Sequence, residues 1–345
     1  MSAVLQQDFS GLLERRDIDW DYFRNSSFLI TGATGLIGSL LARLLIEFSE
    51  RKEGNVSVTV LVRDRKKAEE LFSGYPQVRY LIGSVEEGIS EDNFDFVVHC
   101  ASPTRSKFFV EKPVETIDTI VMGTGRILNS LKDSKRLKKF MYLSSMESYG
   151  VLDDGEVTEE KQGYIDPLNV RSSYSLGKRM AELYTHSYGE EYGINTAIAR
   201  LAMTFGAGIP ASDNRVVKYF CDCAVKGEDI VIRSTGRTVV NMVYTADALA
   251  GILVLLQKGE NGQAYNIVCD NSGVTIADMA NEVAAISDKK ISVRYEQASS
   301  ANGFAPDNTM VLNGKKIREL GWKAEHGFHD ALERTYQYER EQLGE

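Results

Sequence analysis

The sequence predicts an α/β fold: a doubly wound parallel sheet with a smaller mixed α/β region towards the C-terminus. Two observations support this class. From Ser27 onwards, short apolar runs alternate with segments whose apolar residues recur at helical spacing, which is typical of βαβ units. After about residue 205 the predicted helices, turns and strands become short and irregular, which indicates a second region beside the sheet.

The strands of the sheet are expected where apolar runs end in turn residues. They are Phe28–Thr31, Val56–Val62, Val78–Ile82, Phe94–His99, Phe140–Ser144 and Thr196–Leu201, with Ile230–Ile232 and Tyr265–Val268 in the second half. Between the first two strands, one apolar stripe at helical spacing predicts a helix that lies on the sheet. Its members are Ile37, Leu40, Leu41, Leu44, Leu45 and Phe48.

Composition excludes several classes of partner. The 345 residues carry a formal net charge of −9, which argues against a broad surface for nucleic acid or for an anionic membrane. No segment approaches the roughly 20 apolar residues that cross a bilayer. The first residues also lack the basic and apolar stretches of a signal peptide. We therefore expect a cytoplasmic protein with neither nucleic acid nor membrane as its partner.

Neither a disulfide framework nor a metal site is expected. The four cysteines are too few for a framework, and Cys221 and Cys223 have no second pair at metal-site spacing. His326 and His329 could share a helix face, but two histidines alone do not make a metal site. We expect reduced thiols and solvent-facing histidines.

A glycine-rich turn joins the first strand to the first helix. Glycines at this place permit a tight turn and let backbone amides approach a pyrophosphate, with the helix N-terminus facing its negative charge. The turn therefore predicts a Rossmann-type dinucleotide site. Its predicted cofactor-binding residues are Gly32, Thr34, Gly35, Leu36, Ile37 and Gly38.

The end of the second strand leaves the choice of dinucleotide open. A carboxylate there accepts hydrogen bonds from the ribose 2′-OH of NAD, whereas an arginine pairs with the 2′-phosphate of NADP. The sequence places Arg63 and Asp64 side by side. Arg63 at the deciding position favours NADP, Asp64 turned inward favours NAD, and a solvated charged turn is a third interpretation.

These elements suggest a division of the chain. Residues 1–25 form an N-terminal extension that Trp20, Tyr22 and Phe23 pack onto the body. Residues 26–202 form the dinucleotide-binding Rossmann domain. Residues 203–345 are mainly a substrate-binding region, with some segments returning to the Rossmann domain.

A tyrosine and a lysine are placed to act together. Tyr174 and Lys178 are four residues apart and thus share one helix face, where the ammonium is expected to lower the pKa of the phenol and make it a general base. Ser144 and Ser145 end a strand that precedes this helix. Active sites of open parallel sheets lie at the carboxyl ends of the strands, so we expect this pair and the glycine turn at one edge.

At this point the chain resembles the extended short-chain dehydrogenases/reductases, in particular the NAD-dependent epimerase/dehydratase family of nucleotide-sugar enzymes. The resemblance runs from about Phe28 to Trp322. It is carried by the glycine turn and by His99-Cys100-Ala101-Ser102, Leu143-Ser144-Ser145-Met146-Glu147-Ser148-Tyr149-Gly150, Tyr174-Ser175-Leu176-Gly177-Lys178, Tyr244-Thr245-Ala246-Asp247 and Leu320-Gly321-Trp322.

The resemblance implies roles for individual residues. Ser145 hydrogen-bonds the reacting sugar oxygen, Tyr174 is the base and Lys178 its activator, while Ala101 and Ser102 contact the cofactor. Members that resemble 4,6-dehydratases carry Asp-Glu after the serine, and sugar-acid decarboxylases commonly carry Ser-Glu. This chain has Met146-Glu147. The acid that expels a hydroxyl is therefore missing, while Glu147 is retained as a catalytic or structural carboxylate and Met146 as a substrate contact or packing residue.

Departures from the family pattern affect substrate binding. At three positions this chain lacks the residue that is usual in the family. Ile120 replaces the asparagine before Gly123, Met203 replaces a second asparagine, and Val240 replaces the arginine that binds the diphosphate. Diphosphate recognition must therefore be rebuilt or absent. The candidate substrate-binding arginines are Arg171, Arg215 and Arg237.

The resemblance thus implies NAD(P)-dependent modification of a nucleotide-activated sugar through a transient ketone, with an epimerase or decarboxylase favoured over a 4,6-dehydratase. Two alternatives stay open: an NADPH-dependent carbonyl reductase of the same superfamily, and a dinucleotide-binding regulator without turnover. The resemblance also implies a homodimer.

Overall fold

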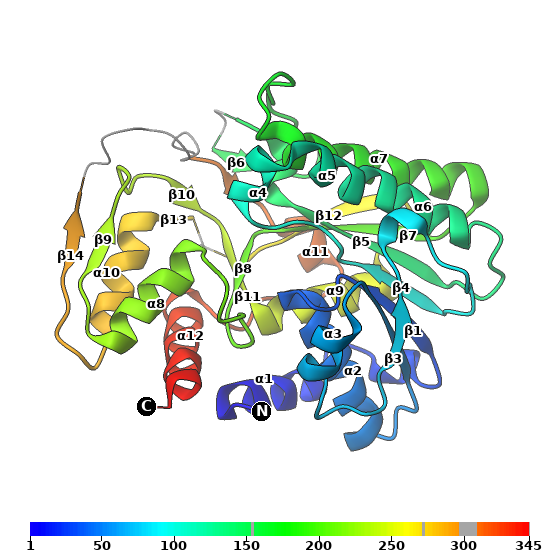
Figure 1. Cartoon of the computed structure of the whole chain (residues 1–345), viewed down its shortest axis with the longest axis horizontal. Coiled ribbons are helices and arrows are strands. Elements are labelled where there is room, and N and C mark those ends of the chain that lie inside the picture. Colours follow the sequence, from blue (N-terminus) through cyan, green and yellow to red (C-terminus); the bar gives the residue numbers. More distant parts are fainter. Residues whose placement is uncertain (153–154, 271–272, 297–308, 345) are drawn as a thin grey trace.

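The fold is built on one parallel sheet. The computed structural model describes residues 1–152, 155–270, 273–296 and 309–344. Within them the sheet has the order β12-β7-β5-β4-β1-β2-β3, with every neighbouring pair parallel (Figure 1). Its strands are β1 Ser27–Thr31, β2 Ser57–Val62, β3 Arg79–Ile82, β4 Phe96–His99, β5 Lys139–Ser145, β7 Thr196–Leu201 and β12 Gln263–Ile267. The predicted doubly wound parallel sheet is confirmed, and no strand end differs from its prediction by more than two residues.

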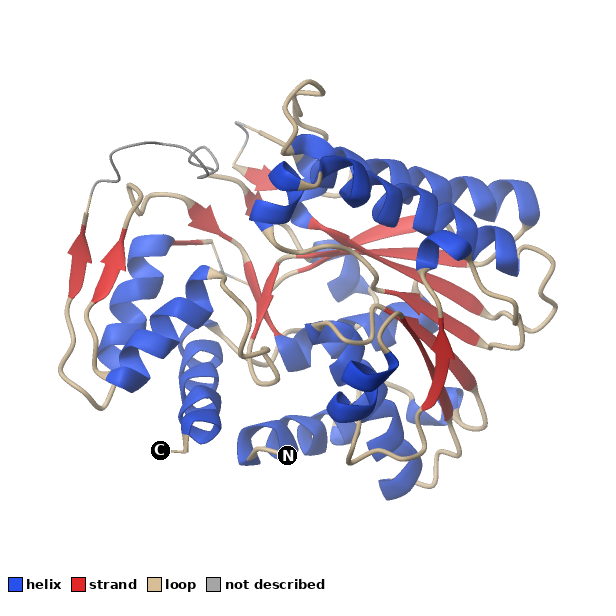
Figure 2. Cartoon of the chain, viewed as in Figure 1, coloured by secondary structure: helices blue, strands red, loops and turns tan. Residues whose placement is uncertain are grey.

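Helices cover both faces of the sheet, as the layers in Figure 2 show. Side chains alternate along a strand, so Phe28 and Ile30 of β1 enter one apolar core while Leu29 enters the other. The helices on the first side are α2 Leu36–Arg51, α3 Arg65–Leu71 and α9 Thr245–Lys258. Those on the second side are α4 Ser106–Glu111, α5 Pro113–Ile117, the π-helical turn η3 Asp118–Met122, α6 Gly123–Leu131 and α7 Ser172–Tyr192.

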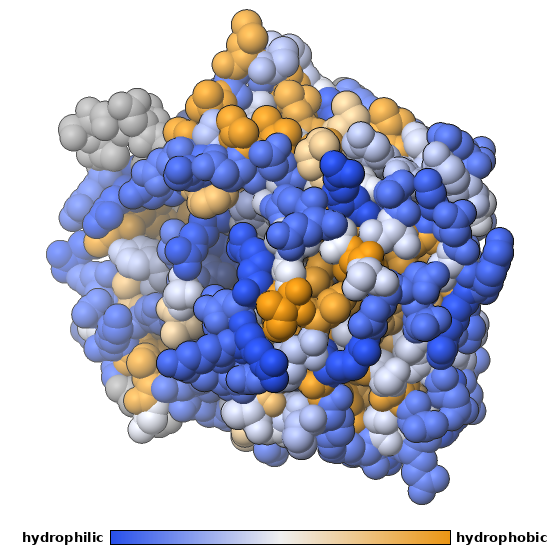
Figure 3. Space-filling model, turned by 45° about the vertical axis from the view of Figure 1, so that its right-hand side comes forward, coloured by the Kyte–Doolittle hydropathy of each residue, from blue (hydrophilic) through white to orange (hydrophobic). Residues whose placement is uncertain are grey.

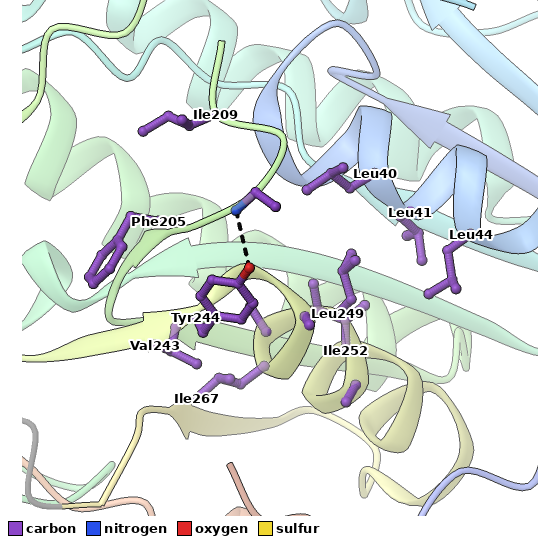
Figure 4. Packing of buried hydrophobic residues seen from close by; sticks show 14 of the residues in the cluster. Leu40, Leu41, Leu44, Phe205, Ile209, Val243, Tyr244, Leu249, Ile252 and Ile267 are labelled. Atoms are coloured by element: carbon purple, nitrogen blue, oxygen red, sulfur yellow. Dashed lines mark hydrogen bonds between the residues drawn. The ribbon is translucent and has the colours of Figure 1, made fainter. Parts of the chain in front are cut away.

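The stripe predicted for the first helix is buried against the body of the protein. Leu40, Leu41 and Leu44 of α2 project towards Leu249 and Ile252 of α9 (Figure 4). All five side chains are essentially inaccessible to solvent. Burying a leucine or isoleucine stabilises the fold by about 1.5–3 kcal/mol, so this layer holds α9, a helix from the second half of the chain, onto the sheet.

The second half supplies a smaller region beside the sheet. Pairs of short strands connect its parts, and one pair joins it to β6 of the first half. The pairs are β8 Met203–Phe205 with β11 Met242–Tyr244, β9 Ile230–Ile232 with β14 Val293–Tyr295, β10 Val239–Val240 with β13 Val274–Thr275, and β6 Glu156–Val157 with β15 Val311–Leu312. The helices are α8 Val216–Lys226, α10 Ile276–Ile286, α11 Lys315–Glu319 and α12 Phe328–Leu343. Figure 3 shows a recess in the surface, left of the centre of the view and lined mainly by hydrophilic residues.

The N-terminal segment packs onto the body through α1 Ala3–Glu14 and the 3₁₀ turn η1 Trp20–Phe23. Trp20 and Phe23 are buried, while Tyr22 is partly exposed. Asp8 accepts hydrogen bonds from Tyr244 and Arg334, so a buried carboxylate adds to the apolar contacts. The remaining 3₁₀ turns are η2 Val85–Glu87 and η4 Met146–Tyr149. None of the described helices is long and apolar enough to span a membrane.

Candidate active site

The glycine turn lies where no larger residue would fit. A Cβ on Gly32 would lie 2.7 Å from the backbone nitrogen of Ala101, and one on Gly38 would lie 2.7 Å from the carbonyl oxygen of Gly32. Gly32 also has a φ of +62°, which L side chains rarely adopt. The first amides of α2, which begins at Leu36, have no partner within the helix. The turn, with Thr34 and Ile37 in the same stretch, therefore forms a cradle that fits a dinucleotide phosphate.

Arg63 and Asp64, which follow β2, make different contacts. The Asp64 carboxylate accepts a hydrogen bond from the backbone amide of Lys67 (3.0 Å) and caps α3. Arg63 is exposed at the end of the strand. One carboxylate oxygen of Asp64 is thus engaged in the helix cap, and the choice between NAD and NADP stays open.

A buried line of hydrogen bonds runs beneath the cradle. The hydroxyl of Thr124 donates to the carbonyl of Ile120 (2.6 Å), so it accepts from Nε2 of His99 (3.1 Å). Nδ1 of the histidine then accepts from Thr31 Oγ1 (2.8 Å), which itself accepts from the amide of Ala101 (3.2 Å). Burial lowers the pKa of His99 to about 3. A neutral imidazole with its proton on Nε2 thus orders the strand ends that flank the glycine turn.

The loop after β4 contains the other predicted cofactor residues. Ala101 and Ser102 are half-buried, and the serine hydroxyl donates to the carbonyl of Pro103 (3.0 Å). The close approach of Ala101 to Gly32 places this loop beside the cradle. The cofactor roles of both residues stay predictions.

Tyr174 and Lys178 lie on one face of α7, as their spacing predicts. The ammonium lies 5.7 Å from the centre of the Tyr174 ring and donates to the carbonyl of Leu143 (2.7 Å). The tyrosine ring is stacked on Phe109, with the ring centres 4.3 Å apart. Sequence reasoning missed Phe109, because an apolar residue on a short helix carries no chemical signal.

The lowered pKa that the sequence predicts for the Tyr174 phenol is not found in the structure. Burial raises the pKa of Tyr174, and the negative charge of Glu147 raises it further. Burial also lowers the pKa of Lys178 to about 8. The helical spacing correctly brought the two groups together, but it could not account for desolvation, which opposes both charged forms.

Ser145, Glu147 and Arg171 surround the Tyr174 hydroxyl. The Ser145 hydroxyl oxygen accepts from the amide of Glu147 (3.2 Å), and its hydrogen bond to Tyr174 opposes the rise in that tyrosine's pKa. The Glu147 carboxylate forms an ion pair with Arg171 (3.0 Å), and both side chains are about one-third exposed. Met146, half-buried, packs against the apolar core. The structure thus brings a partly exposed carboxylate and guanidinium together near Tyr174.

Of the other two candidate substrate-binding arginines, Arg215 contacts the site and Arg237 makes no such contact among the described residues. Arg215 pairs with Asp213 (2.8 Å) and donates to the carbonyl of Thr204 (2.7 Å), and its charge lowers the pKa of Tyr174, which places it at the site. Arg237 is exposed between β9 and β10, and none of these contacts includes it. Their binding roles stay predictions.

A buried ion pair lies behind the site. Glu182, one turn beyond Lys178, pairs with Arg200 of β7 (2.7 Å) and accepts from the hydroxyl of Ser144 (2.5 Å). The same arginine donates to the hydroxyl of Tyr149 (3.0 Å). The sequence carries no signal for this network, because its members are distant in the chain.

The histidines near the C-terminus differ from expectation in one respect. His326 lies just before α12 and approaches Asp247 (3.0 Å), so it is not solvent-facing. His329 is exposed. Among the described residues, no group of three or more histidine, cysteine or acidic side chains is arranged to hold a metal.

Comparisons with known proteins agree with this geometry. A model described as "NAD dependent epimerase/dehydratase family" matches residues 28–268. The chain is 30% identical to UDP-glucuronic acid decarboxylase 3 of Arabidopsis thaliana, over 89% of this chain and 87% of the relative. It is 28% identical to the low-salt glycan biosynthesis protein Agl12 of Haloferax volcanii, over 90% and 97%. Among solved structures, the UDP-glucose 4-epimerase of Thermotoga maritima is similar, with a TM-score of 0.79, 23% identity and coverage of 92% of this chain and 99% of that one.

Proposed function

This chain belongs to the NAD dependent epimerase/dehydratase family, and from that premise we propose that it decarboxylates a nucleotide-linked hexuronic acid through a 4-keto intermediate. It is an enzyme of the NAD(P)-dependent nucleotide-sugar class. The observation that carries the proposal is the ion pair of Glu147 and Arg171 beside Tyr174, with Met146 at the position that carries an acid in 4,6-dehydratase-like members. The relatives named UDP-glucuronic acid decarboxylases support the same choice.

In the proposed reaction, Tyr174, Ser145 and Arg171 have separate roles. Tyr174 takes the proton from the sugar C4 hydroxyl, and Ser145 hydrogen-bonds that oxygen. A nicotinamide dinucleotide held by the glycine turn would supply the acceptor for the C4 hydride. The C4 ketone stands β to the C6 carboxylate, so the C5–C6 bond breaks, CO₂ leaves and its electron pair remains on C5 until a proton arrives there. Arg171 holds the substrate carboxylate beside Glu147, because a guanidinium has donors for two carboxylates.

The test is direct. We expect the purified protein, given NAD⁺ or NADP⁺ and UDP-glucuronic acid labelled with ¹³C at C6, to release labelled CO₂ and to form a UDP-pentose. The dTDP-, GDP- and CDP-linked uronic acids, tested in parallel, identify the nucleotide. Interconversion of C4 epimers without loss of CO₂ would instead indicate an epimerase.

A second candidate, the NADPH-dependent reductase, is favoured by the end of β2. Asp64 is engaged in capping α3, whereas Arg63 is exposed beside it. We therefore propose NADP as the preferred cofactor. A reductase would consume NADPH in proportion to product, whereas a decarboxylase returns its hydride and needs only catalytic amounts.

We expect Arg63→Ala to weaken NADP⁺ binding by about tenfold or more, because a charge-assisted hydrogen bond contributes about 1.5–3 kcal/mol. NAD⁺ binding should stay within about twofold, since NAD⁺ has no 2′-phosphate. Titration calorimetry with both dinucleotides measures this, and Lys66→Ala, also exposed, is the matched control. Tighter binding of NAD⁺ by the unaltered protein would contradict the choice.

We further propose that the enzyme is a homodimer through α5 and α7. These helices pack together and expose Val114 (63%), Ile117 (43%), Met180 (47%) and Leu183 (56%). Apolar side chains gathered on one surface mark interaction sites, and a second copy offers the same surface in return.

A charge at this surface should separate the subunits. We expect Leu183→Glu to halve the mass found by analytical ultracentrifugation without changing the circular dichroism, because the side chain is exposed. Leu343→Glu, at an equally exposed leucine at the end of α12, should leave the mass unchanged. A monomeric unaltered protein at micromolar concentration would refute the dimer.

A further inference from the structure

The Lys178 ammonium is buried without an acidic partner of its own. It donates to the carbonyl of Leu143 (2.7 Å), and it forms no ion pair among the described residues. The nearest carboxylate along α7, that of Glu182, is bound by Arg200 and Ser144. An ammonium has three donors, and a buried cation without partners is costly. Other groups must therefore stabilise its charge.

Tyr142 lies beneath this ammonium. Its ring centre is 4.9 Å from Lys178 Nζ, within the range of a cation–π interaction. Its side chain is 1% exposed, and its hydroxyl has no hydrogen-bond partner among the described residues. The hydroxyl of Thr124 is close enough to oppose the rise in the pKa of Tyr142. A buried hydroxyl without a protein partner is typically satisfied by an ordered water.

We propose that Tyr142 is a positioning residue for the pair formed by Tyr174 and Lys178. The face of the Tyr142 ring and, by way of a buried water, the Tyr142 hydroxyl keep the Lys178 ammonium charged. This deepens the proposed function, because it rests on Tyr174 acting as the base. The Tyr142 hydroxyl is the informative part of the side chain. It has no geometric hydrogen bond among the described residues, although Thr124 lies near it, and the ring that carries it lies against a buried cation.

Of the titratable groups around Lys178, the Glu182 carboxylate supports its charged form, and the others are neutral. His99 stays neutral because burial lowers its pKa to about 3, and Cys100 stays a thiol because burial raises its pKa to about 12. The Glu182 carboxylate raises the pKa of Lys178, but Arg200 also binds it, so its charge is shared between two cations. Tyr174 has a raised pKa and is also neutral near pH 8. Removing Tyr142 should therefore lower the pKa of Lys178, because the charged form loses partners that the neutral form does not need.

The experiment follows the titration of Lys178 itself and needs no turnover. Protein labelled with ¹³C-lysine is titrated by NMR as purified, and Lys178→Met identifies the resonance. We expect a midpoint near the value of about 8 for the unaltered protein. Tyr142→Phe, which removes only the hydroxyl, should move the midpoint to lower pH, and Tyr142→Leu, which also removes the ring, should move it by about one unit or more.

Tyr265→Phe serves as the control, since Tyr265 is a buried tyrosine on β12 whose ring faces Lys316 (4.8 Å) instead. It should leave Lys178 unmoved. An unchanged Lys178 midpoint in either Tyr142 variant would overturn the proposal. Tyr142→Phe keeps the size and shape of the ring, so it should fold even where Tyr142→Leu does not. The experiment measures the titration of Lys178 and not turnover. A negative decarboxylase assay would therefore refute the proposed function without refuting the role of Tyr142.

Discussion

Tyr174→Phe is expected to lower turnover by about 10²–10⁴-fold, the contribution typical of a general base. The reason for the loss is that phenylalanine has no hydroxyl to take the proton from the sugar in the mechanism proposed above. The variant should fold normally, because phenylalanine keeps the ring that is stacked on Phe109 (4.3 Å between ring centres). Release of labelled CO₂ under single-turnover conditions measures the chemical step.

The matched control for this prediction is Tyr188→Phe, two tyrosines further along the same helix and outside the site. It should retain full turnover. Dinucleotide affinity of Tyr174→Phe should stay close to that of the unaltered protein, since the glycine cradle is intact. A Tyr174→Phe enzyme that released CO₂ at the unaltered rate would refute the assignment of the base.

Arg200→Met is expected to reduce the free energy of unfolding by about 3–5 kcal/mol, the usual cost of leaving a buried charge without its partner. Both side chains of the pair are less than one-tenth exposed, and the Glu182 carboxylate would stay buried with only the Ser144 hydroxyl. The pair joins α7 to β7 behind the catalytic residues. Equilibrium unfolding in urea measures the loss.

The double variant Glu182→Met/Arg200→Met should recover much of that stability, because neither charge is then stranded. Arg65→Met, which breaks the exposed Arg65–Glu69 pair on α3, should change stability little. If Arg200→Met were as stable as the unaltered protein, the pair would have to be open to water, contrary to its burial.

Much of the framework could be predicted because it is local. The strands are apolar runs that end at turns, the stripe of α2 has helical period, and the glycine turn needs only neighbouring residues. Tyr174 and Lys178 meet because four residues make about one helical turn. The predicted ends of the strands therefore differ little from those observed.

Other features depend on contacts that no local pattern records. Phe109 under Tyr174, Arg200 beside Glu182 and Tyr142 beneath Lys178 involve residues on different elements. The state of the phenol was predicted with the wrong sign, because spacing reveals a neighbouring ammonium but not the depth at which both groups are buried. The pairing of Glu147 with Arg171 also had to be observed.

By itself, then, the sequence determined the parallel sheet, the glycine turn and the shared helix face of Tyr174 and Lys178, because periodicity, glycine and fixed helical spacing act over a few residues. Only the tertiary structure decided which carboxylate faces which arginine, that Asp64 caps a helix, and in which direction burial shifts the pKa values of Tyr174 and Lys178. Those depend on desolvation and on contacts between distant segments, and both arise only when the chain is folded.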